Sequence, residues 1–317
     1  MRRIFHHATA PGAVAPFPVS LLPRTCPLHP LRLLRVSGPD RLAFLQGQLT
    51  QDLREISEGE CRRYGWTNAQ GRLLATGLIL AWQDSLWLTV AAGIADEVQR
   101  RLRMFVLRAR VDIAAAELPL TGILTGAAAI RIGSADLAAS ADARLVCADW
   151  IAVRVPGDNG RVLLTGNADG IQAFTAPLVR ATASEWALAD IRAGIAGIEA
   201  ATADQYIPQM LNLDLVGGVS FNKGCYTGQE IITRTRHLGR VKRRMYRLLS
   251  DRPLDFGSVI FTTGGETGKV VATAPADNCH EILAVLPTAF ASGPLHADAE
   301  RQVELTLAPL PYAVPVA

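Results

Sequence analysis

The chain is 317 residues long; 49% of its residues are hydrophobic and 19% are charged. A chain of this length and composition can bury a sizeable core on its own, which excludes a disordered, collagen-like or disulfide-stabilised protein. The formal net charge of +3 does not indicate nucleic-acid binding unless the basic residues cluster. Five widely spaced cysteines without a CxxC pair favour a reducing cytoplasm, and the six histidines lack the spacing of a metal site. No run of about 18 or more apolar residues is present, so no membrane-spanning helix is expected.

Residues 1–25 are interrupted by four prolines and are expected to form a flexible N-terminal arm. The regular pattern begins at Leu31, where alternating apolar residues predict a strand. Asp40 is then expected to cap a helix that runs through Gln46, and further on the spacing predicts a β-hairpin and an amphipathic helix. The strand is expected at 31–36, the hairpin at 72–80 and 85–90, and the second helix at 96–106.

A second unit is expected to begin near residue 120, with a helix at 127–131 and a strand at 150–155. After Gly239, short β-like runs separated by glycine and proline predict a small all-β domain. These runs span 240–249, 258–263, 269–273 and 281–286. The expected organisation is therefore an arm at 1–25, a region at 26–239 with an internal boundary near 120, and a C-terminal domain at 240–317.

The stretch around Cys225 is the most distinctive of the chain. Its end, Thr227-Gly228-Gln229-Glu230, matches a capping box, in which a threonine hydroxyl and a glutamate carboxylate satisfy free amides at a helix start. Cys225 would then lie just before a helix N-terminus and two residues from Lys223, and both positive charges favour a thiolate. A reactive or metal-binding thiol would occupy such surroundings. The alternative interpretation is a small buried residue beneath a glycine-rich turn.

The eight residues from Lys223 to Glu230, Lys-Gly-Cys-Tyr-Thr-Gly-Gln-Glu, are identical to the signature of the YgfZ-type folate-binding proteins. These proteins are relatives of the T-protein, the aminomethyltransferase of the glycine cleavage system. Further segments resemble the family in the same order, so that the resemblance covers about residues 31–290. They lie at 36–40, 44–52, 71–75, 186–194, 207–209, 212–213 and 218–221.

This resemblance implies a tetrahydrofolate-binding accessory protein that supports the assembly or repair of iron–sulfur clusters, and indirectly tRNA modification. The implied fold is α+β, with two subdomains around a central folate cavity and a small C-terminal β-barrel. The implied partners are a folate, iron–sulfur proteins such as radical tRNA-modifying enzymes, and in one interpretation tRNA. The implied location is the cytoplasm, without a membrane contact.

The resemblance also assigns roles to residues. Cys225 would be the active thiol and Lys223 its electrostatic partner, and no metal ligands are expected. The remaining residues of the motif would shape the loop, and four others would contact the folate. The loop residues are Gly224, Tyr226, Thr227, Gly228, Gln229 and Glu230, and the folate contacts are Gln209, Asn212, Trp186 and Arg192.

The sequence departs from the transferase relatives at their acidic pair, which follows the Gly-Gly turn of an early strand. Ala75 and Thr76 stand there in this chain, and neither can act as a general base or make a charge-assisted hydrogen bond to a pterin. Arg192 stands where those relatives use a glutamate. Glycine-cleavage chemistry is therefore not expected, and a folate-dependent aminomethyl or methyl transferase is the alternative function.

A basic stretch suggests a second alternative, an RNA-binding module. Seven arginines and lysines and no acidic residue lie between 234 and 247. Clustered arginines would attract tRNA phosphates or the polyglutamate tail of a folate. A solvated helix end followed by a polar strand face explains the same pattern. The basic residues are Arg234, Arg236, Arg240, Lys242, Arg243, Arg244 and Arg247.

Overall fold

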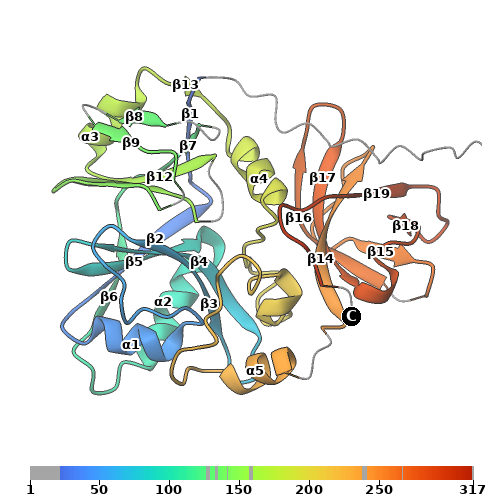
Figure 1. Ribbon diagram of the computed structural model, residues 1–317, viewed down its shortest axis with the longest axis horizontal. Coiled ribbons are helices and arrows are strands. Elements are labelled where there is room, and N and C mark those ends of the chain that lie inside the picture. Colours follow the sequence, from blue (N-terminus) through green and yellow to red (C-terminus); the bar gives the residue numbers. More distant parts are fainter. Residues whose placement is uncertain are drawn as a thin grey trace, which may run out of the picture.

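Five antiparallel strands, in the order β3-β4-β5-β2-β6, form the first sheet of the computed structural model (Figure 1). The structure describes residues 22–125, 129–132, 135–140, 142–156, 160–237, 241–265 and 267–315. The predicted strand and hairpin are confirmed, and the hairpin turns at Gln83 and Asp84, whose φ angles of 52° and 51° suit a two-residue turn. The strands are β2 (Leu31–Ser37), β3 (Cys61–Thr67), β4 (Leu73–Trp82), β5 (Ser85–Ala91) and β6 (Asp112–Ala116).

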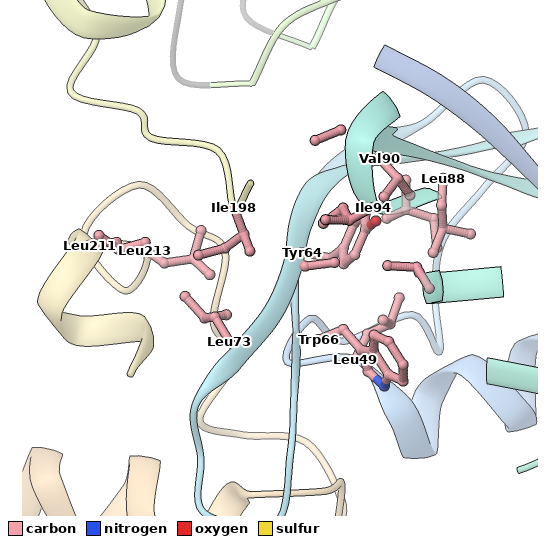
Figure 2. Close-up of a cluster of buried hydrophobic side chains, with 14 of the residues drawn as sticks. Leu49, Tyr64, Trp66, Leu73, Leu88, Val90, Ile94, Ile198, Leu211 and Leu213 are labelled. Carbon is pink, nitrogen blue, oxygen red and sulfur yellow. The ribbon is translucent and has the colours of Figure 1, made fainter. Parts of the chain in front are cut away.

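Strand β4 is buried on both faces. Successive side chains of a strand point to opposite sides of the sheet, so β4 contributes to two different cores. Leu80 and Trp82 pack into the core shared with the second sheet. Ile79 and Ala81 point the other way, into the largest core of the molecule. That core also receives the segment that contains Ile198, which crosses beside the β3–β4 hairpin (Figure 2).

The second sheet has six strands in the order β10-β11-β12-β7-β1-β13. Strand β1 (Arg24–Pro27) lies between β7 and β13, antiparallel to the first and parallel to the second. The predicted arm therefore ends before Arg24, and its residues 1–21 lie outside the described residues. The other strands are β7 (Leu120–Leu124), β10 (Arg144–Val146), β11 (Trp150–Arg154), β12 (Arg161–Gly166) and β13 (Val179–Arg180), and β11 confirms the strand predicted at 150–155.

The helix predicted at 127–131 is wrong where the structure describes it. Ile130 and Arg131 belong to strand β8 (Ile130–Ile132), which pairs with β9 (Ala135–Leu137). The two isoleucines of β8 are buried and Arg131 between them is exposed, which is the period of a strand, and β-branched residues favour it. A helix absent from the sequence analysis, α3 (Ala168–Thr175), follows β12.

Helices α1 (Arg41–Gln48) and α2 (Ala95–Met104) confirm the two helices predicted in the first unit. Asp40 precedes α1 but does not cap it: its carboxylate accepts the amide of Arg110 at 2.7 Å instead. Helix α4 (Ala183–Arg192) begins with a complete capping box formed by Thr182 and Glu185. Across the described ranges, no helix is long and apolar enough to cross a membrane.

The C-terminal part is a closed barrel of six strands, which confirms the expected β-barrel (Figure 1). Its interior is filled by residues such as Leu248, Ile260 and Ile282. Four strands correspond to the predicted β-runs, and two short ones were not predicted. The strands are β14 (Arg243–Ser250), β15 (Val259–Thr262), β16 (Thr267–Pro275), β17 (His280–Pro287), β18 (Leu295–His296) and β19 (Glu304–Ala308).

Helix α4 lies between the second sheet and the barrel, and a buried ion cluster joins it to the barrel (Figure 1). The carboxylate of Glu281, in β17, is only 4% exposed. Its Oε1 accepts from Arg192 at the end of α4 at 2.7 Å, and its Oε2 accepts from Arg247 in β14, also at 2.7 Å. One carboxylate therefore ties the helix and two barrel strands together.

Candidate functional site

Residues 217–228, here called the thiol loop, lie against the chain that follows α1. The hydroxyl of Thr50 donates to the carbonyl of Gly218 at 2.6 Å. The carbonyl of Thr50 accepts from the amide of Ser220 at 2.9 Å. Two motifs that are far apart in the sequence are therefore in direct contact.

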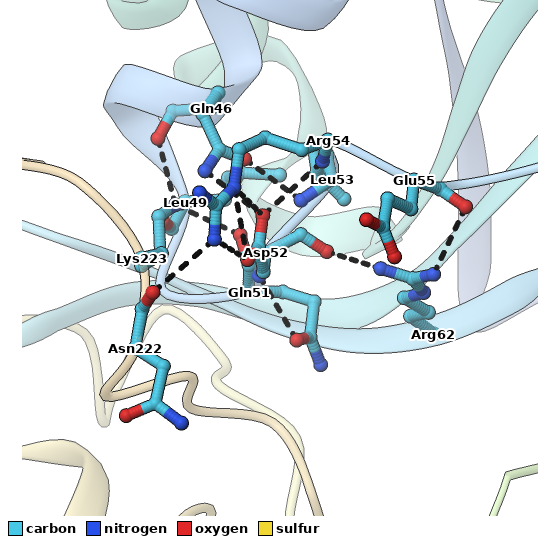
Figure 3. Close-up of polar contacts among 10 residues, drawn as sticks. All are labelled: Gln46, Leu49, Gln51, Asp52, Leu53, Arg54, Glu55, Arg62, Asn222 and Lys223. Atoms are coloured by element: carbon cyan, nitrogen blue, oxygen red, sulfur yellow. Dashed lines mark hydrogen bonds and ion pairs between the residues drawn. The ribbon is translucent and has the colours of Figure 1, made fainter.

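Lys223 is buried within this contact, and its side-chain nitrogen is surrounded by backbone carbonyls (Figure 3). The ring of Tyr226 lies 4.9 Å from the same nitrogen. An ammonium group has three N–H donors, and here all three are used, so none remains for the predicted partner Cys225. The three acceptors are the carbonyls of Gln46 (2.7 Å), Leu49 (2.6 Å) and Gln51 (2.8 Å).

The capping box predicted at Thr227 is not formed by the described residues. Gly228 has a φ of +82°, which no residue in the first turn of a right-handed helix adopts. Helix α5 (Gln229–His237) therefore begins one residue later than the motif predicts. Thr227 contributes its backbone instead: its carbonyl accepts from the hydroxyl of Thr67 at 2.6 Å.

Cys225 is exposed, as is its neighbour Gly224. The interpretation of Cys225 as a small buried residue is therefore wrong. Burial raises the pKa of Cys26 to about 11 and that of Cys61 to about 12, so those thiols remain protonated at neutral pH. Apart from Cys225, Cys147 is the other exposed cysteine of the described chain.

A cleft of about 340 Å³ opens beside the thiol loop. Two of its lining residues carry buried polar atoms that find no partner among the described residues, namely Oε1 of Gln209 and Nε of Arg244. Buried polar atoms are nearly always hydrogen-bonded, so an unpaired acceptor and an unpaired donor in one cleft indicate a place for a polar ligand. The walls come from the turn η2 (Pro208–Leu211) and the residues after it, the thiol loop, α5 and the start of β14.

Asp214 also lines the cleft and is already paired. Arg244 donates to both carboxylate oxygens of Asp214, at 2.8 and 3.0 Å. The guanidinium of Arg236, on the exposed side of α5, lies 4.0 Å from the ring centre of Phe221. The cleft therefore offers an unpaired acceptor and an unpaired donor inside, with an aromatic ring and a cation at its exposed side.

Three of the four residues expected to contact folate do not line this cleft. Asn212 is fully buried, and its amide donates to the carbonyl of Met245 at 2.7 Å, which holds the turn against β14. Trp186 packs in the core, with the guanidinium of Arg161 at 4.7 Å from its ring. Arg192 binds Glu281. Of the four, Gln209 alone lines the cleft.

The positions of the missing acidic pair have structural roles. Ala75 is fully buried in the main core. The hydroxyl of Thr76 accepts from the amide of Ile198 at 3.0 Å, so that it anchors the segment that crosses β4. No carboxylate stands at either position.

The basic stretch does not form one continuous cationic surface. Arg244 and Arg247 bind Asp214 and Glu281, and Arg243 donates to the carbonyl of Thr267. Arg240 lies outside the described residues. The exposed side chains that remain are those of Arg234, Arg236 and Lys242.

Comparison with known proteins gives relatives that match most of the chain. The chain is 29% identical to the tRNA-modifying protein YgfZ of Edwardsiella ictaluri over 302 residues. This matched region covers 88% of this chain and 89% of the relative. It is 30% identical over 223 residues to the tRNA-modifying protein YgfZ of Vibrio vulnificus, with coverages of 70% and 68%. The chain belongs to the YgfZ family. A scan against models of protein families found no match.

The fold of this YgfZ family member is also found in a solved structure. It resembles the glycine cleavage system aminomethyltransferase T of Bartonella henselae with a TM-score of 0.72, over 92% of this chain and 86% of that one. The sequences are only 16% identical, so the likeness concerns the fold. It confirms the predicted α+β class with a terminal barrel.

Several residues of the site were missed by the sequence analysis of this YgfZ family member. Phe221 and Asp214 line the cleft. Phe221 ends a segment that resembles the family but received no role, and no local pattern marks Asp214. The carbonyls that hold Lys223 are backbone groups, which carry no residue signal at all. The capping box of α4 did have a signal, the spacing of Thr182 and Glu185, and a systematic search for that spacing would have found it.

Proposed function

We propose that the protein binds a reduced folate in the cleft beside the thiol loop and supports tRNA modification through Cys225. The observation that carries the ligand assignment is the pair of unpaired buried atoms, Gln209 Oε1 and Arg244 Nε, in one cleft of about 340 Å³. Clefts of this size are typical of small-molecule sites. The name of the relatives, tRNA-modifying protein, supports the cellular role.

The chemistry of the cleft fits tetrahydrofolate. A pterin has amino and amide donors for Gln209 Oε1 and a carbonyl acceptor for Arg244 Nε. The benzoyl ring of a folate suits contact with Phe221, and its glutamate carboxylates suit the exposed cation of Arg236. These four residues would hold the ligand.

When bound, tetrahydrofolate supplies nitrogen atoms that carry one-carbon groups. The chain's own residues bind and orient the ligand, and they provide no carboxylate where the transferase relatives have theirs, because Ala75 and Thr76 take part in packing. An accessory role is therefore favoured over aminomethyl transfer. Cys225 is exposed and follows closely in sequence after Phe221, which lines the cleft. Its thiol would act on iron–sulfur proteins that modify tRNA.

Anaerobic titration calorimetry with tetrahydrofolate tests the ligand. We expect saturable binding at micromolar concentrations and about tenfold weaker binding by Arg244→Lys, since lysine keeps a cation near Asp214 but lacks the Nε donor. Arg243→Lys is the matched control. Arg243 is next to Arg244 in the chain but does not line the cleft, so this variant should bind tetrahydrofolate within about twofold of the parent's affinity. Absence of binding at millimolar folate would refute the proposal. Binding unaffected by Arg244→Lys would exclude this cleft as the site.

For Cys225, we expect that Cys225→Ala folds and binds folate normally but no longer supports iron–sulfur-dependent tRNA modification. An exposed side chain contributes little to stability, so the loss of tRNA modification would come from the missing thiol and not from unfolding. Mass spectrometry of nucleosides from total tRNA measures it, in cells whose only copy carries the substitution. Cys147→Ala, which changes another exposed cysteine, is the control. Normal modification with Cys225→Ala would remove the thiol from the proposed function.

A further inference from the structure

The arrangement of the thiol loop assigns a task to its lysine. Two exposed residues of the loop, Gly224 and Cys225, lie between two buried ones, Lys223 and Tyr226. We propose that Lys223 is a positioning residue, whose side chain fastens the loop to the end of α1 and so fixes where Cys225 is presented. The proposal deepens the function proposed above, in which Cys225 is the active group.

The anchor is made of backbone groups at a helix end. The last carbonyls of a helix have no amide partner within the helix, and the helix dipole makes this end negative. Lys223 places its ammonium there, 2.7 Å from the carbonyl of Gln46, 2.6 Å from that of Leu49 and 2.8 Å from that of Gln51 (Figure 3). A cation is therefore held by three hydrogen bonds at the point where a helix offers free acceptors.

Other contacts of this part of the loop are few. The carbonyl of Asn222 accepts from Arg54 at 3.2 Å, and the ring of Tyr226 faces the ammonium of Lys223 at 4.9 Å. Within the described residues, no hydrogen bond is made by Gly224 or Cys225. Tyr226 packs in the main core, and Lys223 makes the buried hydrogen bonds of this segment. Loss of the ammonium would thus remove the buried hydrogen-bonded attachment of the segment that carries the thiol.

The composition of the chain supports a geometric reason for a lysine at this position. Only three of its 32 basic residues are lysines, and Lys242 and Lys269 are exposed. A compact ammonium directs three donors in tetrahedral directions, which suits three convergent carbonyls, whereas the planar guanidinium of arginine does not. A chain that otherwise uses arginine places its one buried lysine at this point.

The charges around Lys223 are compatible with a protonated side chain at neutral pH. Burial lowers the pKa of Lys223 to about 8, Asp52 acts to raise it and Arg54 to lower it. The three carbonyls also favour the protonated form, because a neutral amine has only two N–H groups to donate. The ammonium is therefore charged when the loop is in place.

Positioning and direct electrostatic activation of the thiol predict different results for Lys223→Met. If Lys223 positions the loop, amide hydrogen exchange at Ser220 should become faster by about tenfold or more, because a local anchor is lost and the hydrogen bond from this amide to the carbonyl of Thr50 opens more often. The pH midpoint of Cys225 alkylation by iodoacetamide should then stay within about 0.3 pH units of the parent, because the ammonium donates to the three carbonyls and not to the thiol. If Lys223 activates the thiol directly, the midpoint should rise by about one unit with unchanged exchange.

Controls separate this role from general destabilisation and from the proposed function. Lys269→Met removes an exposed lysine on the barrel and should change neither measurement. If Lys223→Met does not fold, Lys223→Arg serves instead: it keeps the charge, and faster exchange at Ser220 is again expected. Unchanged exchange in both folded variants would overturn the proposal. The exchange experiment needs neither folate nor tRNA, so normal tRNA modification with Cys225→Ala would refute the proposed function and leave the anchor standing.

Discussion

Replacing Glu281 with alanine is expected to lower the free energy of unfolding by about 3–5 kcal/mol. The carboxylate is 4% exposed and lies between the guanidiniums of Arg192 and Arg247, whose side chains are 20% and 12% exposed. Its removal leaves two largely buried cations without their shared counter-ion. Removing one partner of a buried ion pair costs more free energy than the intact pair contributes, because the remaining charge stays buried and is not hydrated again.

The measurement is urea unfolding followed by tryptophan fluorescence, with the midpoint and slope determined for each variant. Glu304→Ala is the matched control: this carboxylate is also on the barrel but exposed, and its loss should change stability by no more than about 0.5 kcal/mol. Glu281→Gln should fall between the two, because it keeps the shape and one acceptor oxygen, whereas its NH2 group is a donor that faces the second guanidinium. Equal stability of Glu281→Ala and the parent would show that the cluster does not hold α4 to the barrel.

Such a cluster illustrates which features a sequence predicts and which it does not. The hairpin of β4 and β5 was predicted correctly, because the periodicity and the two turn residues, Gln83 and Asp84, are local. The partners of Arg247 and Arg244 are distant in sequence, at Glu281 and Asp214. A run of basic residues therefore suggested a cationic surface, although half of its described members are paired internally.

The second sheet shows the same limit at the level of strands. Strand β1 finds its partners in β7, about a hundred residues later, and in β13 beyond it. No local pattern in the first residues announces these partners, which is why Arg24 was expected to belong to a loose arm. In β8, a short isoleucine-rich segment was taken for helix, because three residues are too few to establish a period.

At the candidate site, the motif predicted part of the local structure around Cys225 correctly and part of it wrongly. Cys225 is exposed in a loop that leads into a helix, as the sequence indicated. The role of Lys223 depends on the carbonyls at the end of α1, and the start of α5 depends on the φ angle of Gly228. Both are properties of the backbone in three dimensions, which residue types alone do not specify.

The same backbone geometry underlies the second large effect: Gly228→Ala is expected to lower the free energy of unfolding by about 2–4 kcal/mol. Gly228 has a φ of +82°, which strains any residue with a Cβ. An added Cβ would also lie 2.5 Å from the carbonyl oxygen of Asn68 and 2.8 Å from the Cα of Gly71. These are backbone atoms and cannot rotate away, so the turn that carries Gly71 and the thiol loop would have to separate.

Two glycines of the same loop divide this effect into its parts. Gly217→Ala has the same backbone strain, with a φ of +76°, but nothing lies within 4 Å of the added Cβ, so its cost should be about 1 kcal/mol. Gly224→Ala has neither strain nor a near neighbour and should be close to neutral. Urea unfolding of the three variants gives the order, and circular dichroism reports whether α5 survives. If Gly228→Ala cost no more than Gly217→Ala, the close contact between Gly228 and Gly71 would not hold the thiol loop against the turn that carries Gly71. The expected excess of the Gly228 cost over the Gly217 cost is the free energy of that contact.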